Sequence, residues 1–152
     1  MPANEARVLI VESNDALRVM LFTVLRHQPL DVDTASTAEE ALDRVTTCDY
    51  ALILIDMDLP AGDAERFLRD FRDLRPGATS FVLAVRDPKK EMTIDPSLVN
   101  AILTKPIEIE TLAEVVRECA LAVPPPVDPL HCPPAESSQP PVVHGDSSQL
   151  AN

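Results

Sequence analysis

Short runs of apolar residues recur along the chain and alternate with amphipathic segments. Three of these runs, residues 8–11, 50–55 and 81–85, consist entirely of aliphatic and aromatic side chains. A strand without polar alternation is expected to be covered on both faces, as in a parallel sheet with helices on either side. The segments between the runs place apolar residues at helical spacing, which is typical of repeated strand–helix units. The pattern therefore predicts an α/β fold.

The pattern predicts a doubly wound, five-stranded parallel sheet with helices on both faces. If the strand order is the flavodoxin-like one, 2-1-3-4-5, the first and third strands are neighbours where the order reverses. The alternation of polar and apolar residues in 30–35 predicts an edge strand. Prolines interrupt residues 86–98, so we expect at most a short turn or two there. The predicted strands are 8–11, 30–35, 50–55, 80–85 and 101–103, and the predicted helices begin at Ser13 or Asn14, at Thr37, at Gly62 or Asp63, and at Glu108.

The composition changes near Val123, which marks a predicted boundary between a domain (1–123) and a tail (124–152). The tail contains eight prolines and neither lysine nor arginine. Such a segment has too little apolar surface to offset the entropy lost on ordering. We therefore predict that the tail is disordered and that its deletion leaves the melting temperature almost unchanged.

Charge and cysteine content bound the environment and the partners. The net charge of -12 would repel nucleic-acid phosphates and anionic lipid, so neither is an expected partner. The chain shows no signal-peptide pattern and no apolar run of about 20 residues, the length that crosses a bilayer. Cys48, Cys119 and Cys132 are odd in number and widely spaced, which predicts neither a disulfide framework nor a zinc site. These features favour the reducing cytoplasm.

Polar residues follow three of the predicted strands directly. Glu12 follows the first strand, Asp56 follows the third, and Lys105 comes just after the fifth. In open parallel sheets, ligands bind beyond the carboxyl ends of the strands. We therefore predict that Glu12 and Asp56 face one crevice and that Lys105 reaches it from the far side. This set offers a nucleophilic carboxylate, an acidic neighbour for Mg²⁺ and a point charge for phosphate oxygens.

Across residues 7–121 the chain resembles the receiver domains of bacterial two-component response regulators, the CheY-like superfamily. The matching motifs are residues 8–12 (VLIVE), 54–60 (LIDMDLP) and 104–106 (TKP). The resemblance implies that Asp56 is the phospho-acceptor and that Glu12 is the first of an acidic pair that binds Mg²⁺. It also implies that Lys105 contacts the phosphoryl group and precedes a cis Pro106. The implied partner is a histidine kinase or a phosphotransfer protein.

The sequence departs from the family pattern at the predicted metal site. Ser13 stands where the family has its second acid, so one charge is lost. Mg²⁺ is held by one or two carboxylates plus waters in many proteins. We therefore expect at most a weak Mg²⁺ site at Glu12 and Asp56, with Asp58 or Asp15 as helpers. Considered alone, Asp58 is predicted to be a solvated loop acid.

Two further departures concern the residues that transmit phosphorylation in the family. The hydroxyl residue expected after the fourth strand is placed at Ala84, and the aromatic residue of the last strand is placed at Ile102. Ala84 cannot donate a hydrogen bond, and Ile102 is expected to stay packed among aliphatic neighbours. Both are therefore predicted to be degenerate switch positions, and partner binding is expected to depend little on phosphorylation.

Three functional hypotheses follow. The leading one is a stand-alone, non-enzymatic receiver that is phosphorylated at Asp56 and acts through protein contacts. The second is a pseudo-receiver, a binding module of the same fold that works without phosphorylation. The third interprets Asp56-Met57-Asp58 as the paired aspartates of a haloacid-dehalogenase-type phosphatase. That family has the motif near the N-terminus of a longer chain, so this hypothesis ranks last. A turn role for Asp56 and a solvated Lys105 are the non-functional alternatives.

Overall fold

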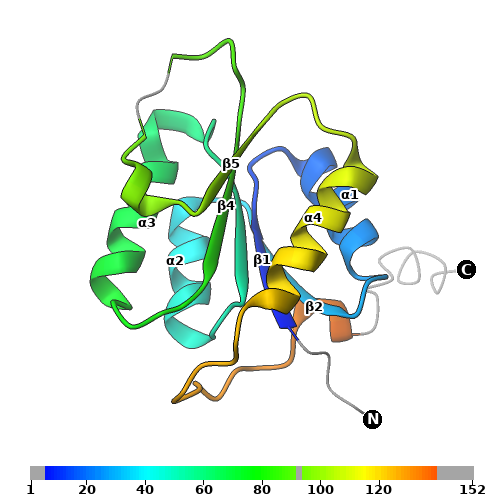
Figure 1. Ribbon diagram of the computed structural model, residues 1–152, viewed down its shortest axis with the longest axis vertical. Helices are drawn as coiled ribbons and strands as arrows, with labels where there is room; N and C mark the ends of the chain where they lie inside the picture. Colours follow the sequence, from blue (N-terminus) through cyan, green and yellow to red (C-terminus); the bar gives the residue numbers. More distant parts are fainter. Residues whose placement is uncertain (1–5, 92–93, 140–152) are drawn as a thin grey trace, which may run out of the picture.

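A five-stranded parallel sheet forms the centre of the computed structural model, which describes residues 6–91 and 94–139 (Figure 1). The strand order is β2-β1-β3-β4-β5, and all four pairings are parallel. The predicted fold class and the position of β2 at an edge are therefore confirmed. The strands are β1 (Ala6–Val11), β2 (Leu30–Ala35), β3 (Leu52–Asp56), β4 (Phe81–Arg86) and β5 (Ala101–Thr104).

Two layers of helices cover the sheet. Helices α2 and α3 pack on one face, and α1 and α4 pack on the other. The predicted caps form, since Asn14 Oδ1 accepts from Leu17 N at 2.9 Å and Thr37 Oγ1 accepts from Glu40 N at 3.1 Å. The helices are α1 (Asp15–Leu25), α2 (Ala38–Thr47), α3 (Asp63–Leu74) and α4 (Ile109–Ala122), and the 3-10 turns are η1 (Pro60–Gly62), η2 (Pro96–Leu98) and η3 (Glu136–Ser138).

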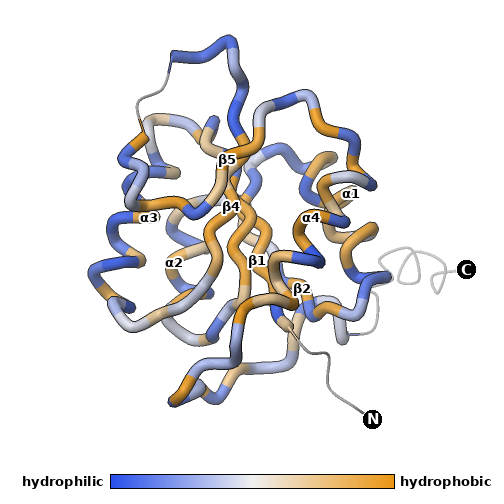
Figure 2. Tube along the Cα trace, in the orientation of Figure 1, coloured by the Kyte–Doolittle hydropathy of each residue, from blue (hydrophilic) through white to orange (hydrophobic). Residues whose placement is uncertain are grey.

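The central strands explain the unbroken apolar runs in the sequence. Every residue of β3 is buried, with Ile53 and Ile55 in the core under α2 and α3, and Leu52 and Leu54 in the core under α1 and α4. Figure 2 shows the apolar residues gathered along the strands, with polar residues on the outer parts of the helices. A strand that contributes to two cores has no solvent face, so it carries no polar alternation.

The connection from β4 to β5 lacks an α-helix in its described residues, 87–91 and 94–100, and contains only η2. This matches the expectation of at most a short turn. The same absence leaves part of β5 uncovered, and Ile102 is 42% exposed. The expectation that Ile102 stays packed among aliphatic side chains is therefore wrong. None of the described helices is long and apolar enough to cross a bilayer.

Residues 130–139 of the predicted disordered tail instead pack on the domain, with η3 beside β2 (Figure 1), while residues 124–129 are exposed. Ala135 is only 3% exposed, and Cys132 forms a disulfide with Cys48. The cysteine pattern predicted no disulfide framework and so did not reveal this bond. The segment needs little apolar surface because polar contacts with the domain and a covalent bond hold it. Residues 140–152 of the predicted tail lie outside the described residues.

Candidate functional site

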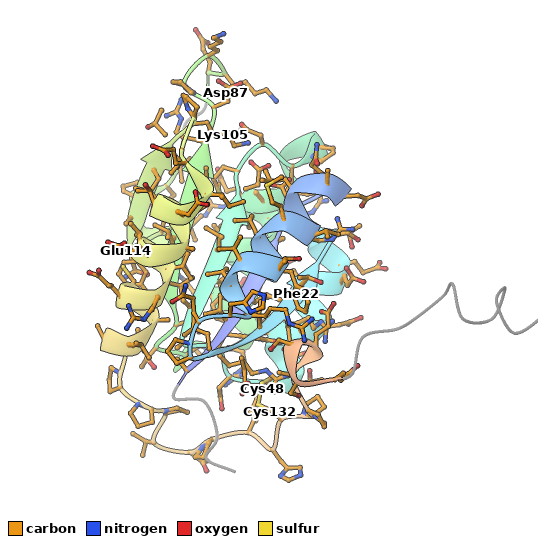
Figure 3. The ribbon with its side chains drawn as sticks, turned by 90° about the vertical axis from the view of Figure 1, so that its right-hand side faces the viewer. Phe22, Cys48, Asp87, Lys105, Glu114 and Cys132 are labelled. Carbon is orange, nitrogen blue, oxygen red and sulfur yellow. A yellow bond between two sulfur atoms is a disulfide. The ribbon has the colours of Figure 1, made fainter. Side chains whose placement is uncertain are left out.

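Glu12, Asp56 and Lys105 meet at the carboxyl ends of the strands, as the sequence predicts. Glu12 directly follows β1 and Asp56 ends β3, and these two strands are neighbours in the sheet. Lys105 follows β5, and its Nζ lies 3.2 Å from Asp56 Oδ1. The Lys105–Pro106 peptide bond is cis, as the resemblance implied. Figure 3 shows Lys105 at one end of the molecule and the Cys48–Cys132 disulfide at the other.

Asp58 is part of this site and is not a solvated loop acid. Its side chain is only 6% exposed, and Oδ2 lies 3.3 Å from Lys105 Nζ while accepting from Asp87 N at 2.9 Å. Its Oδ1 is buried and has no hydrogen-bond partner among the described residues. The Asp58 N–H also donates to Asp56 Oδ1 at 2.9 Å. The Lys105 ammonium therefore bridges the carboxylates of Asp56, at the end of β3, and Asp58, two residues later.

The site carries more negative than positive charge, and this shifts proton equilibria. Burial, together with a hydrogen bond and charge repulsion from Asp56, raises the pKa of Glu12 to about 7. The hydrogen bond from the Asn14 N–H, second in size only to burial, and the Lys105 ammonium lower this pKa without cancelling the rise. Partial burial disfavours the charge of Lys105, yet Asp56 and Asp58 outweigh it and raise the pKa of that lysine. The site therefore favours an additional positive charge, either a proton or a metal ion.

The donor set fits a weak Mg²⁺ site. Within the described residues, no group of three His, Cys, Asp or Glu side chains is arranged to hold a metal ion. Ser13 is exposed, and Asp15 points into solvent, where it pairs with Arg18 at 2.6 Å, so Asp15 is not a helper at the site. Glu12 and Asp56 would supply the one or two carboxylates by which proteins hold Mg²⁺. Asp58 Oδ1, buried beside them without a partner, would add a further acceptor.

Ala84 does not lie after the fourth strand, where the family has its hydroxyl residue. It lies inside β4, completely buried and paired with Ile55, whereas Val85 pairs with Asp56 and Arg86 ends the strand. The predicted strand, 80–85, ended one residue before β4 does, and Ala84 lies inside both. The carboxyl end of β4 therefore presents Arg86, whose Nη2 donates to Lys90 O at 2.9 Å.

A second buried polar cluster lies beside β2, away from this site, and sequence reasoning did not find it. Asp33 is completely buried, although it sits on an edge strand. Its Oδ2 lies 2.7 Å from Arg7 Nη2 and accepts from the Tyr50 hydroxyl at 2.6 Å. The alternating pattern of 30–35 predicts which strand is at the edge, but it does not reveal that the C-terminal segment buries one of its polar residues.

Comparisons with known proteins agree with the fold. The model of the response regulator receiver domain matches residues 8–117. An uncharacterized transcriptional regulatory protein of Bacillus subtilis, YkoG, is 30% identical over 115 residues, which are 74% of this chain and 50% of that protein. The KDP operon transcriptional regulatory protein KdpE of Escherichia coli is 40% identical over 65 residues, 43% of this chain and 29% of that protein. The chain thus spans half or less of the length of these relatives.

Solved structures give the same result. The receiver domain protein (CheY-like) of Methanospirillum hungatei superposes with a TM-score of 0.63 at 25% identity, covering 76% of this chain and 93% of that one. The response regulator TrrA of Thermotoga maritima, solved in complex with Mg²⁺ and BeF, gives a TM-score of 0.63 at 20% identity and covers 75% of this chain and 98% of that one. The second likeness supports the fold alone. With the family model covering most of the chain, the protein belongs to the response regulator receiver domain family.

Proposed function

We propose that Asp56 accepts a phosphoryl group from a histidine kinase or a phosphotransfer protein in two-component signalling. The observation that carries the proposal is the 3.2 Å contact between Asp56 Oδ1 and the Lys105 ammonium, with Glu12 buried beside them. In this proposal the protein works in the cytoplasm through protein contacts and has no enzymatic activity of its own.

The chemistry follows from these groups. A carboxylate oxygen of Asp56 attacks the phosphorus of the donor, the bond from phosphorus to the donor's imidazole nitrogen breaks, and an acyl phosphate forms. Lys105 can move its hydrogen bond from Asp56 to an oxygen of the incoming phosphoryl group. Mg²⁺, held by Asp56 and Glu12 when bound, would neutralise charge between the two anions. Proton loss from Glu12 near neutral pH would prepare that carboxylate to bind the cation.

The test is phosphorylation by a small acyl phosphate in the presence of Mg²⁺, followed by the intact mass of the protein. We expect a slow gain of one phosphoryl group, which Asp56→Asn abolishes. Asp58→Asn serves as the matched control, because Asp58 contacts Lys105 but is not the proposed nucleophile. The same adduct on Asp56→Asn, or none on the parent protein, would contradict the proposal.

A second candidate function is a binding module that works without phosphorylation. It is favoured by Ser13, which removes one acid from the metal site, and by the exposed Ile102 beside a connection whose described residues form no α-helix. Driving a two-state switch almost completely from one state to the other takes about 5.5 kcal/mol of differential affinity. A phosphoryl group that contacts Lys105 alone would supply less, since a hydrogen bond to a charged group is worth about 1.5 to 3 kcal/mol.

Backbone NMR spectra with and without beryllofluoride separate the two functions. Shifts confined to residues near Glu12, Asp56 and Lys105 would favour the module, whereas shifts that spread over residues 86–121 would favour a phosphorylation switch. Membership of the receiver family argues against the phosphatase hypothesis. An assay with a generic aryl phosphate tests that hypothesis directly, since turnover would revive it.

A further inference from the structure

The free edge of β2 is covered by residues 130–139, here called the edge segment. β2 pairs with β1 on one side only, so alternate N–H groups face away from the sheet. Val32 N donates to Ser137 Oγ at 2.7 Å, and Thr34 N donates to Glu136 Oε1 at 2.9 Å. Side-chain oxygens thus take the places that the carbonyl groups of a further strand would occupy. The two groups that bind this edge are an acid and a hydroxyl at adjacent positions of the edge segment.

Three arginines contribute to the same surface. Arg44 Nη2 donates to Glu136 Oε1 at 3.1 Å, Arg26 Nη2 donates to Ser137 O at 3.2 Å, and Arg7 Nη1 donates to Pro133 O at 2.6 Å. The whole chain has only 13 lysines and arginines and a net charge of -12, so a cluster of three is a local exception. One arginine pairs with a carboxylate and two bind backbone carbonyls, so the surface is complementary to an extended peptide that carries an acid at the position of Glu136.

The receptor side of this contact is built into the domain. Asp33 is completely buried and fixes Arg7 through an ion pair of 2.7 Å. The hydroxyl of Tyr50 donates to the same carboxylate, and Asp33 Oδ1 also accepts from Glu136 N at 2.7 Å. Beside Glu136 lies a hollow of about 310 Å³, lined in part by Arg18, Phe22 and Ser36, where additional residues of a peptide could lie. Among the printed contacts of Asp33, that with Glu136 N is the one made by the edge segment, and Arg7, Tyr50 and Arg44 make the others.

We propose that this edge of β2 is a docking site for an extended acidic peptide with a Glu-Ser pair, that the edge segment occupies it as an intramolecular competitor, and that the Cys48–Cys132 disulfide keeps the competitor in place. The disulfide joins residues 84 positions apart, from the end of α2 to the edge segment. Figure 3 shows the disulfide at the end of the molecule away from Lys105.

The disulfide sets the strength of the competition. A dithiol reductant breaks the S–S bond, its two thiols supply two electrons and two protons, and it becomes a disulfide while Cys48 and Cys132 become thiols. Cys48 is buried whereas Cys132 is half-buried, so Cys132 presents the more accessible sulfur to the attacking thiolate. The reduced segment then competes only through its hydrogen bonds, at an effective concentration on the order of millimolar or below.

The test uses the full chain and a fluorescent peptide with the sequence of residues 130–139, carrying serine in place of Cys132. We expect no measurable binding to the oxidised protein. The double variant Glu136→Ala, Ser137→Ala, here called the disarmed protein, lacks the two side chains of the edge segment that bind β2. When reduced, it should bind the peptide at least about tenfold more tightly than the oxidised parent protein does. A peptide with glutamine at the position of Glu136 should bind at least about tenfold more weakly to that variant. Cys119→Ser is the matched cysteine control and should behave as the parent protein does.

Hydrogen exchange gives a second readout that needs no variant. Reduction of the parent protein should increase exchange at the Val32 and Thr34 amides and leave the amides of β3 protected. The proposal is overturned if the peptide binds the oxidised and disarmed proteins equally or binds neither. If the double variant does not fold, unchanged exchange at Val32 and Thr34 on reduction decides against it.

Discussion

Replacing Glu12 by glutamine should stabilise the domain at and above neutral pH and have little effect in acid. The side chain of Glu12 is buried beside Asp56, and its pKa in the folded protein is about 7. In the unfolded chain the carboxyl group has its ordinary pKa of 4.5. The folded state therefore holds this proton more tightly, and the associated stability, complete below pH 4.5, is lost as the pH rises through about 7. Glutamine is neutral at every pH and mimics the protonated form.

The size of the effect follows from the two pKa values. Their difference corresponds to about 3 kcal/mol, since one pKa unit is worth about 1.4 kcal/mol. Most of this is lost between about pH 5 and pH 8, where most of the titration occurs. In a domain of this size, that change corresponds to a difference of about 5 to 10 °C in melting temperature.

Urea unfolding of both proteins at about pH 5, 6, 7 and 8, with a chelator present, measures the effect. The advantage of Glu12→Gln should grow steadily with pH to roughly 2 to 3 kcal/mol. Glu118→Gln, on the exposed side of α4, is the matched control and should show no such trend. A difference between parent and Glu12→Gln that does not vary with pH would refute the reasoning, because Glu12 would then titrate alike in the folded and unfolded chains.

Three other changes give distinct outcomes. Asp33→Ala should cost about 3 to 5 kcal/mol of unfolding free energy, because it leaves Arg7 without its buried partner. The control Glu118→Ala should cost less than about 0.5 kcal/mol. Urea unfolding measures both, and equal costs would contradict the buried cluster. Cys132→Ser should lower the stability of the oxidised protein by about 2 to 4 kcal/mol, and the parent and variant should melt alike in dithiol if the disulfide is the cause. Ser13→Asp should tighten Mg²⁺ binding by at least about tenfold in calorimetry, because a third unit charge near the ion is worth a few kcal/mol; unchanged affinity would show that residue 13 does not face the metal.

The fold and most of the proposed site could be predicted from sequence because both depend on local patterns. The apolar runs specify buried parallel strands, and the polar residues after them must then gather at one edge of the sheet. Glu12, Asp56 and Lys105 were placed correctly for this reason. Asp58 was misjudged, because a loop acid looks solvated until the pairing lysine and the Asp87 N–H are brought to it by other strands.

The C-terminal segment was misjudged for a different physical reason. Composition measures how much apolar surface a segment can bury, and by that measure residues 124–139 cannot fold alone. Their position depends on partners far away in the chain, including Cys48, the three arginines and the N–H groups on the outer edge of β2. The error at Ala84 was smaller: this residue lies inside both the predicted strand, 80–85, and the observed β4, so it could not be the residue that follows the strand.

The poorly covered end of the sheet also affects how the molecule opens. β5 is a four-residue edge strand with Ile102 exposed, whereas β3 is buried throughout. Local opening takes the least free energy where few apolar contacts must be broken, so β5 should separate from β4 well before the central strands part. Lys105 directly follows β5, while Asp56 and Glu12 stay with β3 and β1. We therefore expect local opening of β5 to move Lys105 away from its carboxylates while the rest of the domain stays folded. The rate at which this short strand opens then limits the lifetime of the ion pair.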